Sequence, residues 1–195
     1  MEWIPDDLGS TTLDDHDVPT LLTHVSDGLA FMHANGFTHR DLKPENILIQ
    51  LSRRKLTSAK IADFGTTKCD ISGKMQTYAG SSVYMAPEFW EQELAYTNAV
   101  DMWSFGVIAV ELLTGWEPSL DGWDSRFPPT RTQYQKWIHE VLRPRVAIAL
   151  ETFRPLLRGL LCENPEDRWT AIDCEQWMRM NEQADIGIQG TQKAG

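Results

Sequence analysis

Eight consecutive residues, His39 to Asn46, constrain the fold and chemistry of this chain more than any other feature. They read His-Arg-Asp-Leu-Lys-Pro-Glu-Asn and lie between a segment with helical periodicity and a short apolar segment. Pro44 and the dense polar composition disfavour a regular helix, so the string predicts an irregular loop. This loop places a carboxylate at Asp41, a cation at Lys43 and an amide oxygen at Asn46. Such a set indicates a binding or catalytic loop; the alternative is a solvated polar connection.

The flanking segments predict a mainly α protein with one small β-hairpin region. Apolar residues repeat at helical spacing from Val18 to Met32, with Asp17 as the candidate N-cap and an Asn-Gly pair as the stop. Short apolar segments at 47–49 and 60–62 flank a basic turn and predict two strands. The small sheet should therefore follow the polar loop directly.

A second helix is predicted from Val100 to Gly115, with Thr97 or Asn98 as its cap. It is apolar nearly all round, so we expect it at the buried centre of the fold. Three further helices are predicted at Gln133–Leu142, Val146–Leu161 and Thr170–Met180. The Gly-, Ser- and Thr-rich segment 63–85 predicts a long loop, and loops of that length are usually functional.

Composition excludes several classes of protein. The 195 residues carry 18 Lys+Arg against 28 Asp+Glu, a net charge of −10. This argues against a nucleic-acid partner or an anionic membrane bound through a basic surface. The three cysteines show no metal-binding spacing, and no apolar run is long enough to span a membrane. We therefore expect an intracellular chain, cytoplasmic or nuclear, without a secretory signal.

Two shorter motifs follow the octapeptide. Asp63-Phe64-Gly65 comes directly after a strand-like segment, and Ala86-Pro87-Glu88 closes the long loop. In this order and context, the three motifs resemble the signatures of eukaryotic-type protein kinases. The resemblance covers residues 1–180, which look like the C-terminal kinase lobe from the hinge to the last helix, including a long activation loop. Residues 181–195 are expected to form a disordered tail.

The resemblance implies a role for each polar residue of the loop. Asp41 would accept a hydrogen bond from the substrate hydroxyl, and Lys43 would contact the γ-phosphate of ATP. Asn46 and Asp63 would ligate Mg²⁺, which prefers hard oxygen ligands. A lysine at position 43 looks like the Ser/Thr class rather than the Tyr class. The implied reaction is phosphoryl transfer from Mg-ATP to Ser or Thr of a protein substrate.

The first residues look like the hinge that holds adenine. By the resemblance, the main chain of Glu2 and Ile4 would hydrogen-bond adenine, Leu48 would form the apolar floor, and Asp6 or Asp7 would lie near the ribose.

The same region is acidic, since no Lys or Arg precedes Arg40. Asp6 or Asp7 together with Glu45 and Glu111 could form a groove that favours substrates with Arg or Lys upstream of the acceptor. The alternative is an ordinary solvated acidic face.

Three regulatory residues follow from the resemblance. Arg40 would pair with a phosphorylated residue of the activation loop, for which Thr77 is the first candidate and Ser72 and Thr67 are weaker ones. Ser81 would bridge Asp41 and Lys43. The alternative for Thr77 is an unmodified polar loop residue.

Three further matches are structural. Glu88 and Arg168 should form a buried ion pair, and Asp101 should hydrogen-bond the backbone of the His39-Arg40 turn. Trp169 stands where relatives often have proline, and the sequence offers no functional reason for it.

The residues before His39 contain no Gly-rich loop, and no lysine or arginine that could replace the family's nucleotide-binding lysine. The N-terminal kinase lobe is therefore expected to be absent from these 195 residues, and the polypeptide alone is expected to be a weak or inactive kinase. The alternative is a kinase-derived binding module that docks protein partners without catalysis.

Overall fold

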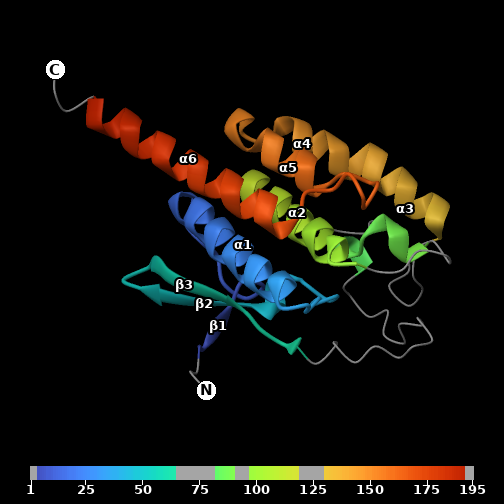
Figure 1. Ribbon diagram of the computed structural model, residues 1–195, viewed down its shortest axis with the longest axis horizontal. Helices are drawn as coiled ribbons and strands as arrows, with labels where there is room; N and C mark the ends of the chain where they lie inside the picture. The colour runs from blue at the N-terminus through green and yellow to red at the C-terminus, as the bar shows by residue number, and fades with distance from the viewer. Residues whose placement is uncertain (1–3, 65–81, 91–96, 119–129, 192–195) are drawn as a thin grey trace.

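The structure is a computed structural model that describes residues 4–64, 82–90, 97–118 and 130–191, with side chains described as far as Asn181 except that of Ser82 (Figure 1). Its α-helices are α1 (Val18–Ala34), α2 (Ala99–Thr114), α3 (Arg131–Trp137), α4 (Arg143–Ile148), α5 (Arg154–Leu160) and α6 (Ala171–Thr191). Its strands β1 (Asp6–Asp7), β2 (Ile47–Ser52) and β3 (Lys55–Ile61) form one antiparallel sheet in the order β1-β2-β3. The fold is thus mainly α with a small sheet.

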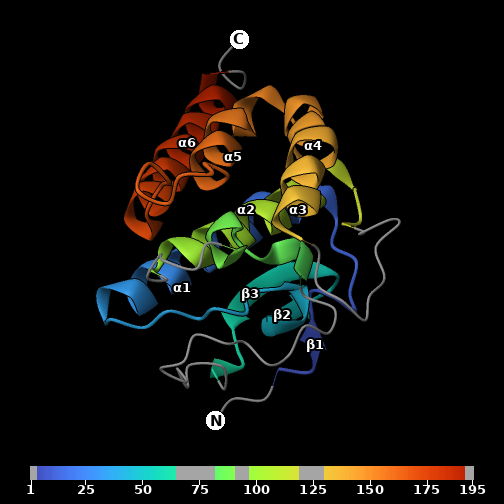
Figure 2. The same cartoon turned by 90° about the vertical axis from the view of Figure 1, so that its right-hand side faces the viewer.

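The elements lie in three levels. Both views show the sheet at one end, α1 and α2 in the middle, and α4, α5 and α6 at the other end (Figures 1 and 2). Contacts of α1 with β3 and with α6, and of α2 with α5, join these levels. The loop that follows α1 and leads into β2 therefore lies next to the sheet.

Helix α2 is the centre of the core, as its composition predicts. Every residue from Val100 to Val110 is buried, including the polar Asp101 and Ser104. Gly106 permits close packing of the end of α5, because a Cβ atom at this position would lie 3.0 Å from Leu160 Cβ and 2.8 Å from Cδ2 of the next residue, Leu161. The buried polar residues on such a helix need partners within the protein.

The hairpin also forms where the sequence predicts it. Arg53 and Arg54 both have left-handed backbone conformations, with φ of 52° and 67°, as a tight two-residue connection between β2 and β3 requires. Ile47 and Ile49 of β2 face the core and are fully buried.

Asp17 precedes α1 as predicted, but its side chain does not cap the helix. Its carboxylate is 1% exposed and accepts a hydrogen bond of 2.9 Å from the backbone N–H of Leu56 in β3. A preceding 3₁₀ turn, Asp15–Asp17, already leads into the helix, and Pro19 in the first turn has no N–H to be capped. Asp17 therefore ties α1 to the sheet.

The single helix predicted over Val146–Leu161 is wrong. Helix α4 ends at Ile148, the backbone becomes extended at Ala149 and Leu150, and α5 begins at Arg154 after a 3₁₀ turn at Glu151–Phe153. Pro155 in the first turn of α5 fits a helix start, where its missing N–H costs nothing, better than a helix interior.

The predicted segment 133–142 is helical, but it begins earlier and changes type. Thr130 and Gln133 form a capping box, so α3 begins at Arg131, and Ile138–Leu142 then form a π-helix.

Helix α6 continues through Thr191, beyond the predicted end at Met180 and into the segment 181–195 that was expected to be a disordered tail. Glu182, Gln183 and Ala184 favour helix, and no proline interrupts the segment. Within the described ranges, none of the helices combines the length and apolar character needed to cross a membrane.

Candidate active site

The loop between α1 and β2 brings Asp41, Lys43 and Asn46 together. Lys43 Nζ donates to Asp41 Oδ2 at 2.8 Å, and Asn46 Nδ2 donates to the Asp41 backbone oxygen at 2.8 Å. A 3₁₀ turn at Pro44–Asn46 forms the bend that returns Asn46 to Asp41. The three predicted side chains therefore form one connected unit.

Asp63 is held beside this unit through its neighbour Ala62. Asn46 O accepts a hydrogen bond of 2.9 Å from Ala62 N, and the buried ring of His39 lies with Nε2 at 2.8 Å from Ala62 O. Asp63 itself is exposed and has a left-handed backbone with φ of 60°. Non-glycine residues rarely adopt this conformation, and it occurs often at functional sites.

The hydrogen bonds also fix the tautomer of His39. A carbonyl oxygen can only accept, so Nε2 must donate to Ala62 O, while Nδ1 accepts a hydrogen bond of 3.3 Å from Asp41 N. A neutral imidazole with its proton on Nε2 satisfies both contacts. His39 thus links the segments that carry Asp41 and Asp63.

Asp101 supports the loop from α2, as predicted. It is completely buried, and its carboxylate accepts hydrogen bonds of 2.7 Å from both His39 N and Arg40 N. Arg40 has a φ of 71°, so the two adjacent N–H groups can turn toward one carboxylate. His33 Nε2, from the last turn of α1, lies 2.9 Å from Asp101 Oδ2.

His33 was missed in the sequence prediction. A histidine on an otherwise apolar helical stripe was the available signal, but its partner lies 68 residues away along the chain.

The residues present fit Mg²⁺. The side-chain nitrogen of Asn46 donates a hydrogen bond to Asp41 O. The side-chain oxygen, Oδ1, is therefore the atom of Asn46 that would bind a cation. Asp63 would add a carboxylate, so the donor set contains only hard oxygen atoms, as Mg²⁺ prefers. Across the part of the chain that the structure describes, no group of three or more His, Cys, Asp or Glu residues has a metal-binding arrangement.

The predicted adenine site is only partly described, because Glu2 lies outside the described residues. Ile4 is buried, and Leu48 is half-buried and pairs with Asp7 in the register of β1 and β2. The Asp7 carboxylate accepts hydrogen bonds of 2.9 Å from both N and Oγ of Ser10. The structure therefore brings Leu48 beside the first strand, whereas Asp7 stabilises its own turn.

Glu45 and Glu111 share one acidic region with Glu117. Burial raises the pKa of Glu111, a hydrogen bond of 3.0 Å from Tyr84 Oη lowers it, and the charges of Glu45 and Glu117 raise it further. The pKa of Tyr84 is raised by burial and by Glu111, so the phenol remains a neutral donor. We call Glu45, Glu111 and Glu117 the acidic cluster.

Two residues of the predicted groove, Asp7 and Glu45, lie on either side of Gly9. Gly9 separates Asp7 from the acidic cluster, since a Cβ atom there would lie 3.2 Å from Asp7 Oδ1 and 2.9 Å from Glu45 Cγ. Asp6 is exposed on β1. Tyr84 was missed in the sequence prediction because nothing in the string around it indicates a partner on α2.

Glu88 and Arg168 form the predicted ion pair. Arg168 Nη1 and Nη2 lie 2.7 and 3.0 Å from the two carboxylate oxygens of Glu88, and both side chains are buried. Arg168 also donates to Ala99 O and lies over the Trp103 ring, 5.2 Å from its centroid. The pair therefore packs against the first turns of α2.

Trp169 packs directly against Gly159 of α5. A Cβ atom at Gly159 would lie 2.2 Å from the indole, and Trp169 N donates to Gly159 O at 3.0 Å. The indole therefore fills the space that the missing side chain of Gly159 leaves. The regulatory candidates Thr67, Ser72, Thr77 and Ser81, together with Gly65, lie outside the described residues.

A family profile and several known proteins are similar to this chain. A family profile described as "Protein kinase domain" matches residues 6–180. The chain is 36% identical over 179 residues to calcium/calmodulin-dependent protein kinase type 1 of Caenorhabditis elegans, covering 91% of this chain and 50% of that protein. It is 36% identical over 146 residues to the serine/threonine-protein kinase SCH9 of Saccharomyces cerevisiae, covering 74% of this chain and 16% of that protein.

A third relative is the inhibitor of nuclear factor kappa-B kinase subunit beta of Mus musculus. It is 44% identical over 107 residues, covering 54% of this chain and 14% of that protein. The chain thus spans half or less of the length of these three relatives.

Proposed function

The chain belongs to the protein kinase family, and we propose that it contributes the catalytic loop, residues 39–46, of a Mg-ATP-dependent protein serine/threonine kinase. One observation carries the proposal: Asp41, Lys43 and Asn46 are joined by hydrogen bonds in one loop, which is tied through Ala62 to the segment of Asp63. Phosphoryl transfer depends mainly on positioning and on charge stabilisation, and this arrangement supplies both.

In the proposed reaction, the Asp41 carboxylate accepts a hydrogen bond from the substrate hydroxyl and orients its oxygen toward the phosphoryl group. Lys43, now 2.8 Å from Asp41, stabilises negative charge on the transferred group. Asp101 keeps Asp41 in place because it fixes the backbone of the two preceding residues.

Mg²⁺ bound by Asn46 and Asp63 would neutralise charge on the nucleotide phosphates. Leu48 and the segment that begins at Ile4 would bind the adenine ring, with Glu2 as a further main-chain contact.

The acidic cluster supports a proposal about substrates. Glu45 lies in the loop that carries Asp41, and its charge acts on Glu111, which also feels the charge of Glu117. A substrate with Arg or Lys upstream of the acceptor would find complementary charge there. Regulation would act through Arg40, which lies next to Asp41, if Thr77 is phosphorylated.

A second candidate function is a non-catalytic module that docks protein partners. The 38 residues before His39 contain neither a Gly-rich loop nor a lysine, so the 195 residues tested alone lack these two phosphate contacts of the family. Each lost charge-assisted contact costs about 1.5–3 kcal/mol and each lost neutral contact about 1 kcal/mol. We therefore expect the 195-residue polypeptide to bind Mg-ATP only in about the millimolar range.

The test is phosphorylation of Ser, Thr and Tyr peptides by the 195-residue chain at saturating Mg-ATP, followed by mass spectrometry. We expect weak transfer to Ser or Thr that falls at least ~100-fold in Asp41→Asn, while Asp15→Asn, an exposed control, is unchanged. Transfer that survives Asp41→Asn, or that prefers Tyr, would contradict the proposed kinase. Absent transfer together with absent Mg²⁺-dependent nucleotide binding would support the docking module.

A further inference from the structure

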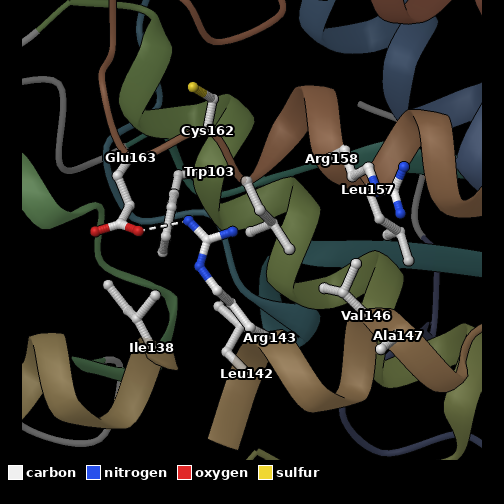
Figure 3. Close-up of a pocket in the computed structure, with 11 residues that line it drawn as sticks. Trp103, Ile138, Leu142, Arg143, Val146, Ala147, Leu157, Arg158, Cys162 and Glu163 are labelled. Carbon is white, nitrogen blue, oxygen red and sulfur yellow. Dashed lines mark hydrogen bonds and ion pairs between the residues drawn. The ribbon is translucent and has the colours of Figure 1, made fainter. Parts of the chain in front are cut away.

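A cavity of about 290 Å³ lies away from the catalytic loop, between α2, α4, α5 and the π-helix Ile138–Leu142 (Figure 3). None of the residues that line it belongs to the catalytic loop or to the segment of Asp63. An engineered apolar cavity of roughly 150 Å³ already binds benzene, so this volume is sufficient for a small organic ligand.

The floor of the cavity is apolar. Trp103 of α2, Leu157 and Leu161 contribute side chains from the core, and all three are almost completely buried. Ile138 and Leu142 come from the π-helix, and π-helical segments are often found at functional sites. An apolar body would thus be removed from water on several sides.

The charged groups of the cavity are unequal in number. Its lining contains the two guanidinium groups of Arg143 and Arg158 but the single carboxylate of Glu163. Arg143 and Glu163 form an ion pair with each other, and Figure 3 shows Arg143 directed toward Glu163, with Arg158 beside Leu157. Within the described residues, Arg158 has no ion pair. The cavity therefore has one cation in excess, although the chain as a whole carries a net charge of −10.

From this combination we propose that the cavity is a binding site for a small free carboxylate with an unbranched or compact apolar body, such as a medium-chain fatty acid. The apolar body occupies the space over Trp103 and Leu157, and the carboxylate meets Arg158 at the rim. A charge-assisted hydrogen bond to a guanidinium is among the stronger polar contacts available to a carboxylate. This site is independent of the proposed nucleotide site.

The direct test is isothermal titration calorimetry of the 195-residue chain with octanoate, 1-octanol and butyrate. Octanoate should bind saturably with one site. Octanol, which lacks the charge, should bind about tenfold more weakly. Butyrate should bind on the order of 100-fold more weakly, because each buried CH₂ contributes a factor of about four. Equal affinities for octanoate and octanol would overturn the proposal, as would the absence of saturable octanoate binding.

Two variants locate the site. Ala147 lines the cavity from the exposed side of α4, so Ala147→Trp should fill the space without removing core contacts and should abolish octanoate binding. Arg158→Gln should weaken octanoate about tenfold and leave octanol unchanged. Lys136→Gln removes the same charge from the outer surface of α3 and should change neither. Octanoate binding that persists in Ala147→Trp would overturn the assignment of the site.

A second readout uses the half-buried Cys162, which lines the same cavity. Octanoate should slow alkylation of Cys162 by iodoacetamide at least about threefold. Cys174 is buried, and burial raises the pKa of its thiol to about 12, so it should stay unlabelled while the protein is folded. Unchanged labelling of Cys162 at saturating octanoate would place the ligand elsewhere and contradict the proposal.

Discussion

Two buried carboxylates, those of Asp101 and Glu88, lie near the first turns of α2 and are stabilised in different ways. We call each carboxylate, together with its partners, an anchor. Asp101 accepts hydrogen bonds from two backbone N–H groups and lies 2.9 Å from Nε2 of His33. Glu88 is instead paired with the full charge of Arg168, which also donates to backbone oxygens at Ala99, Cys162 and Glu163.

The difference indicates that the two anchors stabilise different parts of the molecule. The Asp101 carboxylate binds the backbone of the two residues that precede Asp41, so it positions the loop that carries the proposed catalytic residues. The Glu88–Arg168 anchor joins a segment that precedes α2 in the sequence to one that follows it. It contacts no predicted catalytic residue, so we expect it to stabilise the fold as a whole. Substitution of Arg168 should therefore lower the global stability more than substitution of Asp101 does. Substitution of Asp101 should disturb the order of the loop 39–46 more than substitution of Arg168 does.

The largest expected effect is that of Arg168→Met, which leaves Glu88 buried without its counter-charge. We expect a loss of about 3–5 kcal/mol in the free energy of unfolding, measured by urea denaturation. The double variant Glu88→Leu/Arg168→Met should recover a large part of the loss. A loss below about 1 kcal/mol in the single variant would show that the ion pair is not the architectural anchor.

Asp101→Asn should cost less stability, about 2 kcal/mol, because an amide oxygen in the place of Oδ2 can still accept from His33 Nε2 and His39 N, and only the hydrogen bond from Arg40 N is lost. Its main effect should be local, so hydrogen exchange at the amides of His39 and Arg40 should accelerate at least tenfold relative to amides in α6. Arg168→Met, compared under conditions where it is folded, should not show this local effect. If the amides of His39 and Arg40 exchange as slowly in Asp101→Asn as in the unsubstituted chain, the proposed difference between the two anchors is wrong.

His33→Gln tests how much the side-chain hydrogen bond from His33 to Asp101 contributes to the stability of the Asp101 anchor. Two backbone donors remain, so we expect a loss of about 1 kcal/mol in urea denaturation and a smaller rise in amide exchange than for Asp101→Asn. His33→Phe, which keeps an aromatic ring without a donor, should cost more than His33→Gln. The reverse order would mean that His33 acts by packing alone.

The smallest effect concerns Glu111, whose pKa is raised by burial. Because the folded protein holds this proton more tightly than the unfolded chain, stability should increase as the pH falls from neutral through the pKa of Glu111. Tyr84→Phe removes the hydrogen bond that lowers this pKa, so the ¹³C-detected carboxyl titration should move to higher pH. Glu111→Gln should abolish the pH-dependent gain. A titration that moves to lower pH in Tyr84→Phe would contradict the assigned contact.

The two anchors also show what could be predicted from the sequence. The octapeptide predicted the connected loop of Asp41, Lys43 and Asn46, and the resemblance to kinases supplied Asp101 and the Glu88–Arg168 pair. These residues lie in motifs whose local sequence is distinctive. His33, Tyr84 and Asp17 have no such context, because each role depends on a partner that only the folded chain brings near.

Helix boundaries were less predictable for a related reason. Apolar periodicity continues across Val146–Leu161, but the structure breaks at Ala149 and Leu150 so that α4 and α5 can pack separately against α2. Pro155 was the available signal and is tolerated in the first turn of a new helix. At α6, polar composition suggested a tail, although the backbone continues as helix.

Asp41, Lys43, Asn46 and Asp63 are proposed to form one site for a metal-bound nucleotide. The most direct measurement is an NMR titration of the isotope-labelled chain with ATP, in the presence of Mg²⁺ or of EDTA. We predict saturable shifts of the Asn46 side-chain amide and of backbone signals at 41–46 and 61–64, dependent on Mg²⁺ and lost in Asp63→Asn. Shifts confined to other parts of the chain, or equal shifts with EDTA, would contradict it.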